Sequence, residues 1–90
     1  MEVKYRKLFL KDLKKLKSYQ VHYNRVYEIA FEILPKAESL REIKNLKSMK
    51  GYPKRYRIRA GDFRIGLEVQ DNKVEMMRVL HRKEFYRYFP

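Results

Sequence analysis

The spacing of hydrophobic residues changes along this chain of 90 residues, and each change predicts a different kind of element. Residues 3–8 alternate apolar and basic side chains, which is typical of a short strand. From Phe9 to Leu16 the apolar residues recur every three or four positions, and this spacing predicts a helix over residues 9–17. A polar break then separates this helix from the next apolar stretch.

A second helix is predicted over residues 21–34, where Val26, Ile29 and Ile33 repeat the helical spacing. Pro35 disfavours helical geometry in the residue before it, so this helix should end there. The two helices are expected to form a hairpin whose apolar stripes pack on a sheet.

The segment 36–54 is polar apart from three expected contacts with the core, at Leu40, Ile43 and Leu46. It contains a turn signal at residues 51–53, Gly-Tyr-Pro. His22 and Tyr23 begin the second helix without any partner in the sequence, and we interpret both as surface residues.

Strands and two-residue turns alternate in the next part of the chain: residues 55–60, Gly61-Asp62, residues 63–70, Asp71-Asn72 and residues 73–80. A short aromatic tail, HRKEFYRYFP, follows as residues 81–90. The order of elements predicts an α+β fold, with the helices on one face of a mostly antiparallel sheet. The length predicts a single domain over residues 1–90.

The turn at Gly61-Asp62 sets the register of the first two strands of this meander. Counting from the turn places Arg59 opposite Arg64 and Arg57 opposite Gly66. Because side chains alternate between the faces of a strand, one face is apolar and must form the core: Tyr56, Ile58, Ala60, Phe63, Ile65 and Leu67. The other face carries the remaining residues: Arg55, Arg57, Arg59, Arg64, Gly66 and Glu68.

Like charges that face each other across strands destabilise the pair, so the arginines predict a bound anion that offsets the repulsion. Guanidinium groups match phosphate oxygens in two-point geometry. Gly66 lies beside Arg57, and a glycine inside a strand often marks a close approach of a ligand. The alternative is a solvated arginine face that nearby carboxylates neutralise in part.

The overall charge strengthens the case for an anionic partner. The chain has 23 Lys and Arg against 11 Asp and Glu, a net charge of +12, and both halves of the chain are basic. A folded basic domain favours nucleic acid or an acidic protein as partner. A charged but solvated surface is the alternative, and a membrane-binding helix is disfavoured because strand-like segments share the charge.

Several kinds of site are excluded or disfavoured. The chain has no cysteine, so it has neither disulfides nor a thiolate metal site, which suits the reducing cytoplasm, and we expect a cytoplasmic protein. No apolar run reaches the ~18 residues of a membrane span, and no secretory signal is evident at the start. His22 and His81 lie far apart in the sequence, so we expect neither metal nor cofactor.

The tail can add a second set of groups if it folds over the arginine face. It would bring the imidazole of His81, the guanidinium of Arg82 and several aromatic rings to bound nucleotides. Aromatic rings beside basic groups hold the bases of single-stranded RNA. We expect Phe85 to fill the edge of the core instead, and for Tyr86 both interpretations stay open.

The stretch LKSMKGYPKRYRIRAGDFRIGLEV, followed by VLHRKEFYRYF, resembles the RelE/ParE superfamily of bacterial and archaeal toxins. The resemblance covers nearly the whole chain and is closest to the RelE-like branch. It implies an mRNA endonuclease that acts on codons in the ribosomal A site. Cleavage would proceed without metal, by in-line attack of a ribose 2′-hydroxyl on the adjacent phosphate, and would leave a cyclic phosphate. It also implies a small antitoxin that is encoded next to the toxin. The net charge of +12 leads us to expect that this antitoxin is acidic.

Carried over residue by residue, the resemblance implies one catalytic set: Arg57, Arg59, Arg64, His81, Arg82 and Tyr86. A second set is expected to contact RNA and the ribosome: Lys47, Lys50, Lys54, Arg55, Gly66 and Lys83.

One departure from the family pattern changes the expected chemistry. Relatives carry lysines at the positions of Arg57 and Arg59, and arginine effectively never loses its proton in proteins. Both arginines can stabilise a charged phosphorane, but neither can serve as general base. We therefore assign acid–base work to His81, because imidazoles titrate near neutral pH, with the phenolate of Tyr86 as the alternative.

Two other functions stay open on the sequence alone. ParE-like members of the superfamily share the fold and inhibit DNA gyrase without cutting nucleic acid. A weak or inactive homologue that binds RNA without toxicity is the third hypothesis.

Overall fold

The structure is a computed structural model, and it describes all residues from 1 to 90. The elements in chain order are β1 (Glu2–Tyr5), α1 (Lys7–Lys15), the 3-10 turn η1 (Leu16–Ser18), α2 (Gln20–Glu28), the π-helical turn η2 (Ile29–Ile33), α3 (Leu34–Lys36), the 3-10 turn η3 (Leu40–Glu42), β2 (Leu46–Met49), β3 (Tyr52–Ala60), β4 (Phe63–Gln70), β5 (Lys73–His81) and α4 (Phe85–Tyr88). The strands form one five-stranded sheet in the order β1-β5-β4-β3-β2. Only β1 and β5 are parallel. The predicted α+β class is confirmed.

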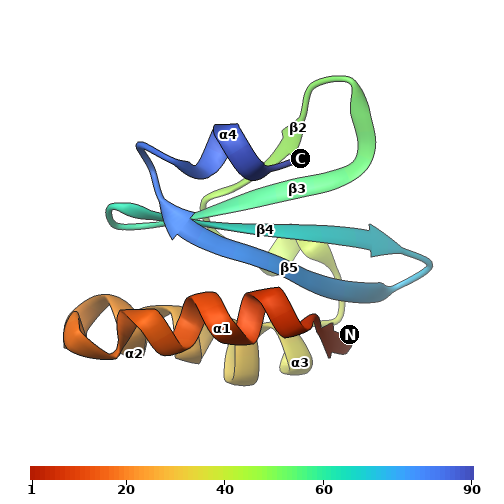
Figure 1. Ribbon diagram of the computed structural model, residues 1–90. Coiled ribbons are helices and arrows are strands. Elements are labelled where there is room, and N and C mark those ends of the chain that lie inside the picture. The colour runs from red at the N-terminus through yellow and green to blue at the C-terminus, as the bar shows by residue number, and fades with distance from the viewer.

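The sheet has a different covering on each face. Helices α1, α2 and α3 lie along one face, and the short helix α4 lies over the other (Figure 1). Residues of α1, α2 and the apolar face of β3, β4 and β5 enclose the main core, in which Phe9, Val26 and Ile65 are fully buried. A smaller cluster of Met77, Phe85 and Phe89 lies under α4 on the opposite face. No helix of the structure has the length and apolar character to cross a membrane.

The predicted register of the central hairpin is confirmed in full. Arg59 pairs with Arg64 and Arg57 pairs with Gly66 across β3 and β4. Gly61 adopts a positive φ of 61° at the first position of the turn, a conformation that costs glycine little. Turn geometry and hydrophobic alternation therefore agree, and the arginines share one face because the apolar residues occupy the other.

The strand predictions were wrong in three places. The segment Leu46–Met49 forms β2, which the sequence analysis left without structure. A register shift between Ser48 and Met49 interrupts the alternation of apolar residues that normally reveals a strand. Pairing with β2 in turn lengthens β3, which begins at Tyr52 and not at residue 55. In contrast, β1 ends at Tyr5, because the chain enters α1 at Lys7.

The predicted end of the second helix was also wrong, because helical geometry continues through Pro35 to Lys36. The preceding turn, Ile29–Ile33, is π-helical, and its bonding pattern would pair the carbonyl of Ala30 with the nitrogen of Pro35, which has no hydrogen. The hydroxyl of Tyr5 donates to that carbonyl instead, at 2.7 Å. A side chain from β1 therefore satisfies the acceptor that proline leaves free.

His22 and Tyr23 are half-buried, not surface residues as predicted. The His22 ring packs on Phe63 with 5.0 Å between ring centroids, and it also lies against Gly61. Helix α2 therefore contacts the turn between β3 and β4, a contact between distant segments that helical spacing does not reveal.

Candidate functional site

The arginine face comprises Arg57, Arg59 and Arg64 on β3 and β4, on the side of the sheet that α1 and α2 leave free. Arg59 is exposed, and Arg57 and Arg64 are half-buried. Lys47 of β2 pairs with Arg57 and extends the positive surface by one strand. None of these four side chains forms an ion pair with a carboxylate.

Arg64 is held at the centre of this face by its own turn. Its Nη1 atom donates to the carbonyl oxygens of Gly61 and Phe63, at 2.7 and 3.0 Å. Its Nε and Nη2 atoms donate no hydrogen bond within the protein. Burial and the neighbouring guanidinium of Arg57 lower the pKa of Arg64 below its ordinary value. The side chain is therefore oriented by the protein but is not neutralised by it.

The tail adds two more groups to the arginine face. Arg59 and Arg82 also lower the pKa of Arg64, whereas the phenol of Tyr86 raises it, so all three lie within electrostatic range of Arg64. Arg82 is anchored by its backbone N–H, which donates to the carbonyl of Asp62 at 2.8 Å. Its side chain lies 3.6 Å from the Asp62 carboxylate, and both side chains are exposed, so this pair is weak.

Helix α4 presents Tyr86 to the solvent beside these arginines. Phe85 is fully buried beneath the helix, as predicted, and Tyr86 is 58% exposed. The rings of these two residues meet edge to face, with centroids 5.0 Å apart. Tyr86 is therefore not a core residue, and its hydroxyl is accessible to a bound phosphate or ribose.

The expectation of an open approach at Gly66 was wrong. Gly66 is buried, and the ring of Phe89 lies directly on it: an added Cβ would come within 2.8 Å of two ring carbons of Phe89. The glycine is required because the tail packs there, and the space that the sequence assigned to a ligand belongs to the protein itself. Gly66 thus makes no surface for RNA.

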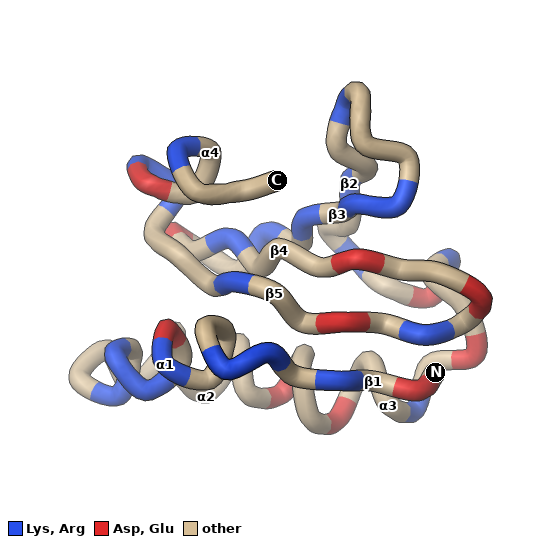
Figure 2. The backbone as a smooth tube through the Cα atoms, turned by 45° about the vertical axis from the view of Figure 1, so that its right-hand side comes forward, with Lys and Arg blue, Asp and Glu red and all other residues tan.

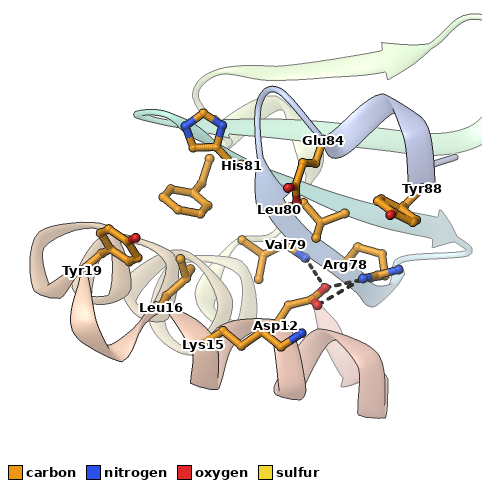
Figure 3. A pocket seen from close by; sticks show the side chains of 11 residues that line it. Asp12, Lys15, Leu16, Tyr19, Arg78, Val79, Leu80, His81, Glu84 and Tyr88 are labelled. Atoms are coloured by element: carbon orange, nitrogen blue, oxygen red, sulfur yellow. Dashed lines mark hydrogen bonds and ion pairs between the residues drawn. The ribbon is translucent and has the colours of Figure 1, made fainter.

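His81 does not join the arginine face. It pairs with Phe63 across β5 and β4, whereas Arg64 pairs with Leu80, so His81 points to the opposite side of the sheet. At the free edge of β5 it lines a pocket of about 630 Å³ between α1 and α4, together with Tyr19 and Tyr88 (Figure 3). Its Nδ1 atom accepts a hydrogen bond from the backbone N–H of Lys83, at 3.1 Å.

This hydrogen bond restricts the chemistry of His81. In the neutral ring one nitrogen carries the proton and the other accepts. Because Nδ1 accepts from Lys83, the neutral ring carries its proton on Nε2 and has no free lone pair. In this conformation Nδ1 is not free to accept a proton from a substrate, and the role of His81 as general base stays a prediction.

Three comparisons with known proteins bear on these observations. The family described as the ParE toxin of the type II toxin–antitoxin system parDE matches residues 3–86. Toxin RelE3 of Methanocaldococcus jannaschii is 41% identical over 91 residues, and the alignment covers 100% of both chains. The chain belongs to the RelE/ParE family of toxins.

Solved structures give the same result for the fold. The RelB-RelE antitoxin-toxin complex from Methanococcus jannaschii contains a chain with 38% identity and a TM-score of 0.78, which covers 97% of this chain and 99% of that chain. The archaeal RelE-RelB complex from Pyrococcus horikoshii OT3 contains a chain with 27% identity and a TM-score of 0.71, with coverages of 93% and 97%. Within the family, the toxin is therefore of the RelE type.

The other residues predicted to contact RNA differ in their exposure and in whether their charge is already paired. Lys50 is exposed in the turn between β2 and β3, and Lys83 is exposed before α4. Lys54 is exposed on β3, beside the register shift with β2. Arg55 shares the arginine face, but its Nε atom donates to Glu68 at 3.0 Å, so its charge is already paired.

Asp12 and Arg78 form an ion pair that the sequence pattern did not predict. Asp12 is 5% exposed and accepts from the Nε atom of Arg78 at 2.8 Å and from the backbone N–H of Val79 at 3.1 Å (Figure 3). This carboxylate raises the pKa of Arg78, chiefly through the hydrogen bond. A signal was present, because Asp12 lies on the apolar stripe between Phe9 and Leu16 in a helix that otherwise carries only lysines as charged residues.

Charge is distributed unevenly along the sheet of the toxin. Acidic segments gather on β4, β5 and the turn that joins them (Figure 2). They include Glu68, which pairs with Glu75, and Asp71 in the turn. Arg59 and Arg64 lie at the other end of β4, beside the turn between β3 and β4. An anionic ligand is therefore attracted to the end of the sheet where Arg82 and Tyr86 also lie.

Proposed function

We propose that this toxin is a ribosome-dependent endoribonuclease that cleaves mRNA codons in the A site. The observation that supports the proposal most strongly is the assembly of Arg57, Arg59, Arg64, Arg82 and Tyr86 on one face by three separate segments of the chain. Three guanidinium groups without a carboxylate partner, and a fourth that is only weakly paired, surround one phenol, and this arrangement suits a phosphate diester in RNA.

The reaction is a transesterification within the RNA strand. The ribose 2′-oxygen attacks the adjacent phosphorus, a bond from the 2′-oxygen to phosphorus forms, and the bond from phosphorus to the 5′-oxygen breaks. The products are a 2′,3′-cyclic phosphate and a 5′-hydroxyl. The negative charge on the phosphate oxygens grows toward the transition state, and Arg57, Arg59 and Arg64 stabilise it because they are already oriented.

Two proton transfers remain, from the 2′-hydroxyl and to the leaving 5′-oxygen. Arginines do not exchange protons near neutral pH, and His81 lies on the other side of the sheet. We assign removal of the 2′-hydroxyl proton to Tyr86 in its phenolate form, because its side chain is exposed and lies within electrostatic range of Arg64. The leaving 5′-oxygen takes its proton from water. We assign to Arg82 the stabilisation of the leaving oxygen, after its guanidinium separates from Asp62.

We also infer that an acidic antitoxin binds the toxin. The similar chains from Methanococcus jannaschii and Pyrococcus horikoshii OT3 occur in complexes with RelB. A net charge of +12 favours an acidic partner, because complementary potentials accelerate encounter and fix the orientation of the complex. An amphipathic helix or an added strand is the usual means by which such a peptide binds a folded domain.

A second candidate function is inhibition of DNA gyrase. The family that matches residues 3–86 is described as the ParE toxin of the parDE system. This function requires a protein-binding surface and no proton transfer, so it does not depend on the hydroxyl of Tyr86.

The deciding experiment is induced expression of the toxin with mapping of mRNA 5′ ends. We expect new ends inside translated codons, within minutes of induction and only in messages that ribosomes are translating. Intact mRNA together with induction of the DNA-damage response would favour gyrase inhibition. Intact mRNA without growth arrest would leave only a non-toxic RNA-binding homologue.

A pair of matched variants tests whether cleavage depends on the arginine face. Arg64→Ala should abolish the new 5′ ends while the protein stays folded, because loss of one oriented donor typically costs about 10²-fold or more in rate. Arg41→Ala removes the same charge from an exposed position in η3 and should cleave like the wild type. Equal cleavage by both variants would contradict the phosphate-binding role of Arg64.

A further inference from the structure

The last residues of the toxin pack into a site that only glycine permits. Phe89 is 2% exposed, although it is the penultimate residue of the chain. Its ring lies on Gly66 so closely that an alanine there would place a methyl group 2.8 Å from two ring carbons. Contacts this short between carbons are strongly repulsive, so any side chain at this position must displace the ring.

Two further contacts hold the same ring. Phe85 lies one helical turn earlier, with its centroid 5.2 Å from that of Phe89, and both belong to the small cluster with Met77. On the other side, the guanidinium of Arg55 lies 5.5 Å from the centroid of the Phe89 ring. Arg55 is itself held by Glu68. The ring is therefore enclosed by β3, β4, β5 and α4.

The buried rings of Phe85 and Phe89 determine the position of Tyr86, which lies between them in the chain. Tyr86 follows Phe85 and is exposed. Its place relative to Arg64 therefore depends on where α4 lies. Helix α4 has only four residues, too few to be stable without tertiary contacts. Phe85 fixes its beginning, and Phe89 fixes its end.

We propose that Gly66 and Phe89 are positioning residues that hold Tyr86 beside Arg64. This inference rests on the proposed endoribonuclease function for its kinetic consequence, but not for the packing that it describes. Neither residue contacts RNA: Gly66 provides the space, Phe89 fills it, and α4 keeps the Tyr86 hydroxyl in place. A misplacement of about 1 Å at a reacting group can cost about 10²-fold in rate.

The placement of Tyr86 is tested first, without any activity measurement. 3-Fluorotyrosine is incorporated at position 86, and its fluorine resonance is recorded in the wild type, Gly66→Ala and Phe89→Ala. We expect a distinct resonance in the wild type that moves toward the value of the unfolded chain in both variants. An unchanged resonance in both variants would overturn the proposal, whatever the toxin does to RNA.

The kinetic test is a set of double-mutant cycles with single-turnover cleavage on programmed ribosomes. Gly66→Ala and Phe89→Ala should each lower the cleavage rate by about 10²-fold, with ribosome affinity unchanged because the arginines stay in place. In the Tyr86→Phe background, the same substitutions should cause no further loss. Equal losses in both backgrounds would show a general structural effect and would overturn the positioning role.

A third comparison isolates the steric cause. If the methyl group acts only by displacing the ring, Gly66→Ala should have no effect once Phe89→Ala is present. Ser48→Ala, on an exposed position of β2, is the matched control and should behave like the wild type. If the wild type does not cleave RNA at all, the proposed function fails, and the fluorine measurement alone decides whether Gly66 and Phe89 position Tyr86.

Discussion

The folded structure disfavours the positive charge of Arg64. Its pKa lies below the ordinary value because burial removes water from the guanidinium and Arg57 repels it. At neutral pH an arginine remains charged, so the lowered pKa means that this charge destabilises the folded state relative to the unfolded chain. A bound phosphate removes the repulsion, which is the physical reason to expect an anion at this residue and not at Arg55, whose charge Glu68 already neutralises.

The proton-transfer role is tested by comparing Tyr86→Phe with His81→Ala. Tyr86→Phe should lower single-turnover cleavage by about 10²-fold or more, the usual size of general acid–base catalysis. His81→Ala should change the rate much less, because the imidazole faces away from Arg64 and its Nδ1 accepts from Lys83. Rapid-quench measurement with ribosomes in excess separates this rate from binding. The opposite order of effects would return the role to His81 and require the imidazole to move.

Asp12 of α1 binds the edge of β5 at a point where no neighbouring strand supplies a hydrogen-bond acceptor. Strand β1 pairs with β5 only as far as Met76, so the edge of β5 is free beyond this residue. Asp12 accepts the N–H of Val79 on that free edge and also binds Arg78. Arg78 in turn lies 5.7 Å from the ring centroid of Tyr88, which connects α1 to α4. Without Asp12, an edge N–H and a half-buried guanidinium would lose their acceptor.

Asp12→Asn should therefore destabilise the toxin by about 3 kcal/mol, the lower range for breaking a buried ion pair. Chemical denaturation followed by circular dichroism measures this free energy of unfolding. Glu28→Gln is the matched control, because it breaks the exposed pair with Arg25 within α2 and should cost less than about 0.5 kcal/mol. Similar losses in the two variants would show that the buried pair contributes no more than a surface pair.

At the scale of the whole molecule, one face of the sheet forms the main core and the other face carries the arginines. The face that α1, α2 and α3 cover holds the main core and carries the stability (Figure 1). The other face carries only the small cluster under α4, and Arg57, Arg59 and Arg64 on this face have no carboxylate partner. A compact chain with a radius of gyration of 11.9 Å thereby offers one strongly positive surface to its partners.

This polarity predicts how the proposed antitoxin binds. The association rate of the toxin with the product of the neighbouring small gene should fall at least about tenfold between 0.05 and 0.5 M salt, because charge steering is screened within a few ångströms at high salt. Stopped-flow mixing measures this rate. A rate that does not depend on salt would indicate that apolar contacts, and not the arginine face, direct the encounter.

The amino-acid sequence by itself determined the central hairpin and the face that its arginines occupy. Gly61-Asp62 is a two-residue turn, and the apolar residues on both sides alternate without interruption, so the register of β3 and β4 follows by counting. These are local properties, because the turn and the alternation involve residues close in the chain. The two helices followed from the same kind of pattern, and the resemblance to the RelE/ParE superfamily rested largely on this hairpin.

Only the tertiary structure decided which other residues meet the arginines. Gly66 and Phe89 are far apart in the chain, so nothing local shows that the ring covers the glycine. The same holds for Asp12 and Val79, which are 67 residues apart. His81 points away from the arginines because the register shift between β4 and β5 moves the end of β5 by one residue, and packing sets both this shift and the course of the tail. Contacts between distant segments depend on the burial of the whole chain, and the period of a single element carries no record of them.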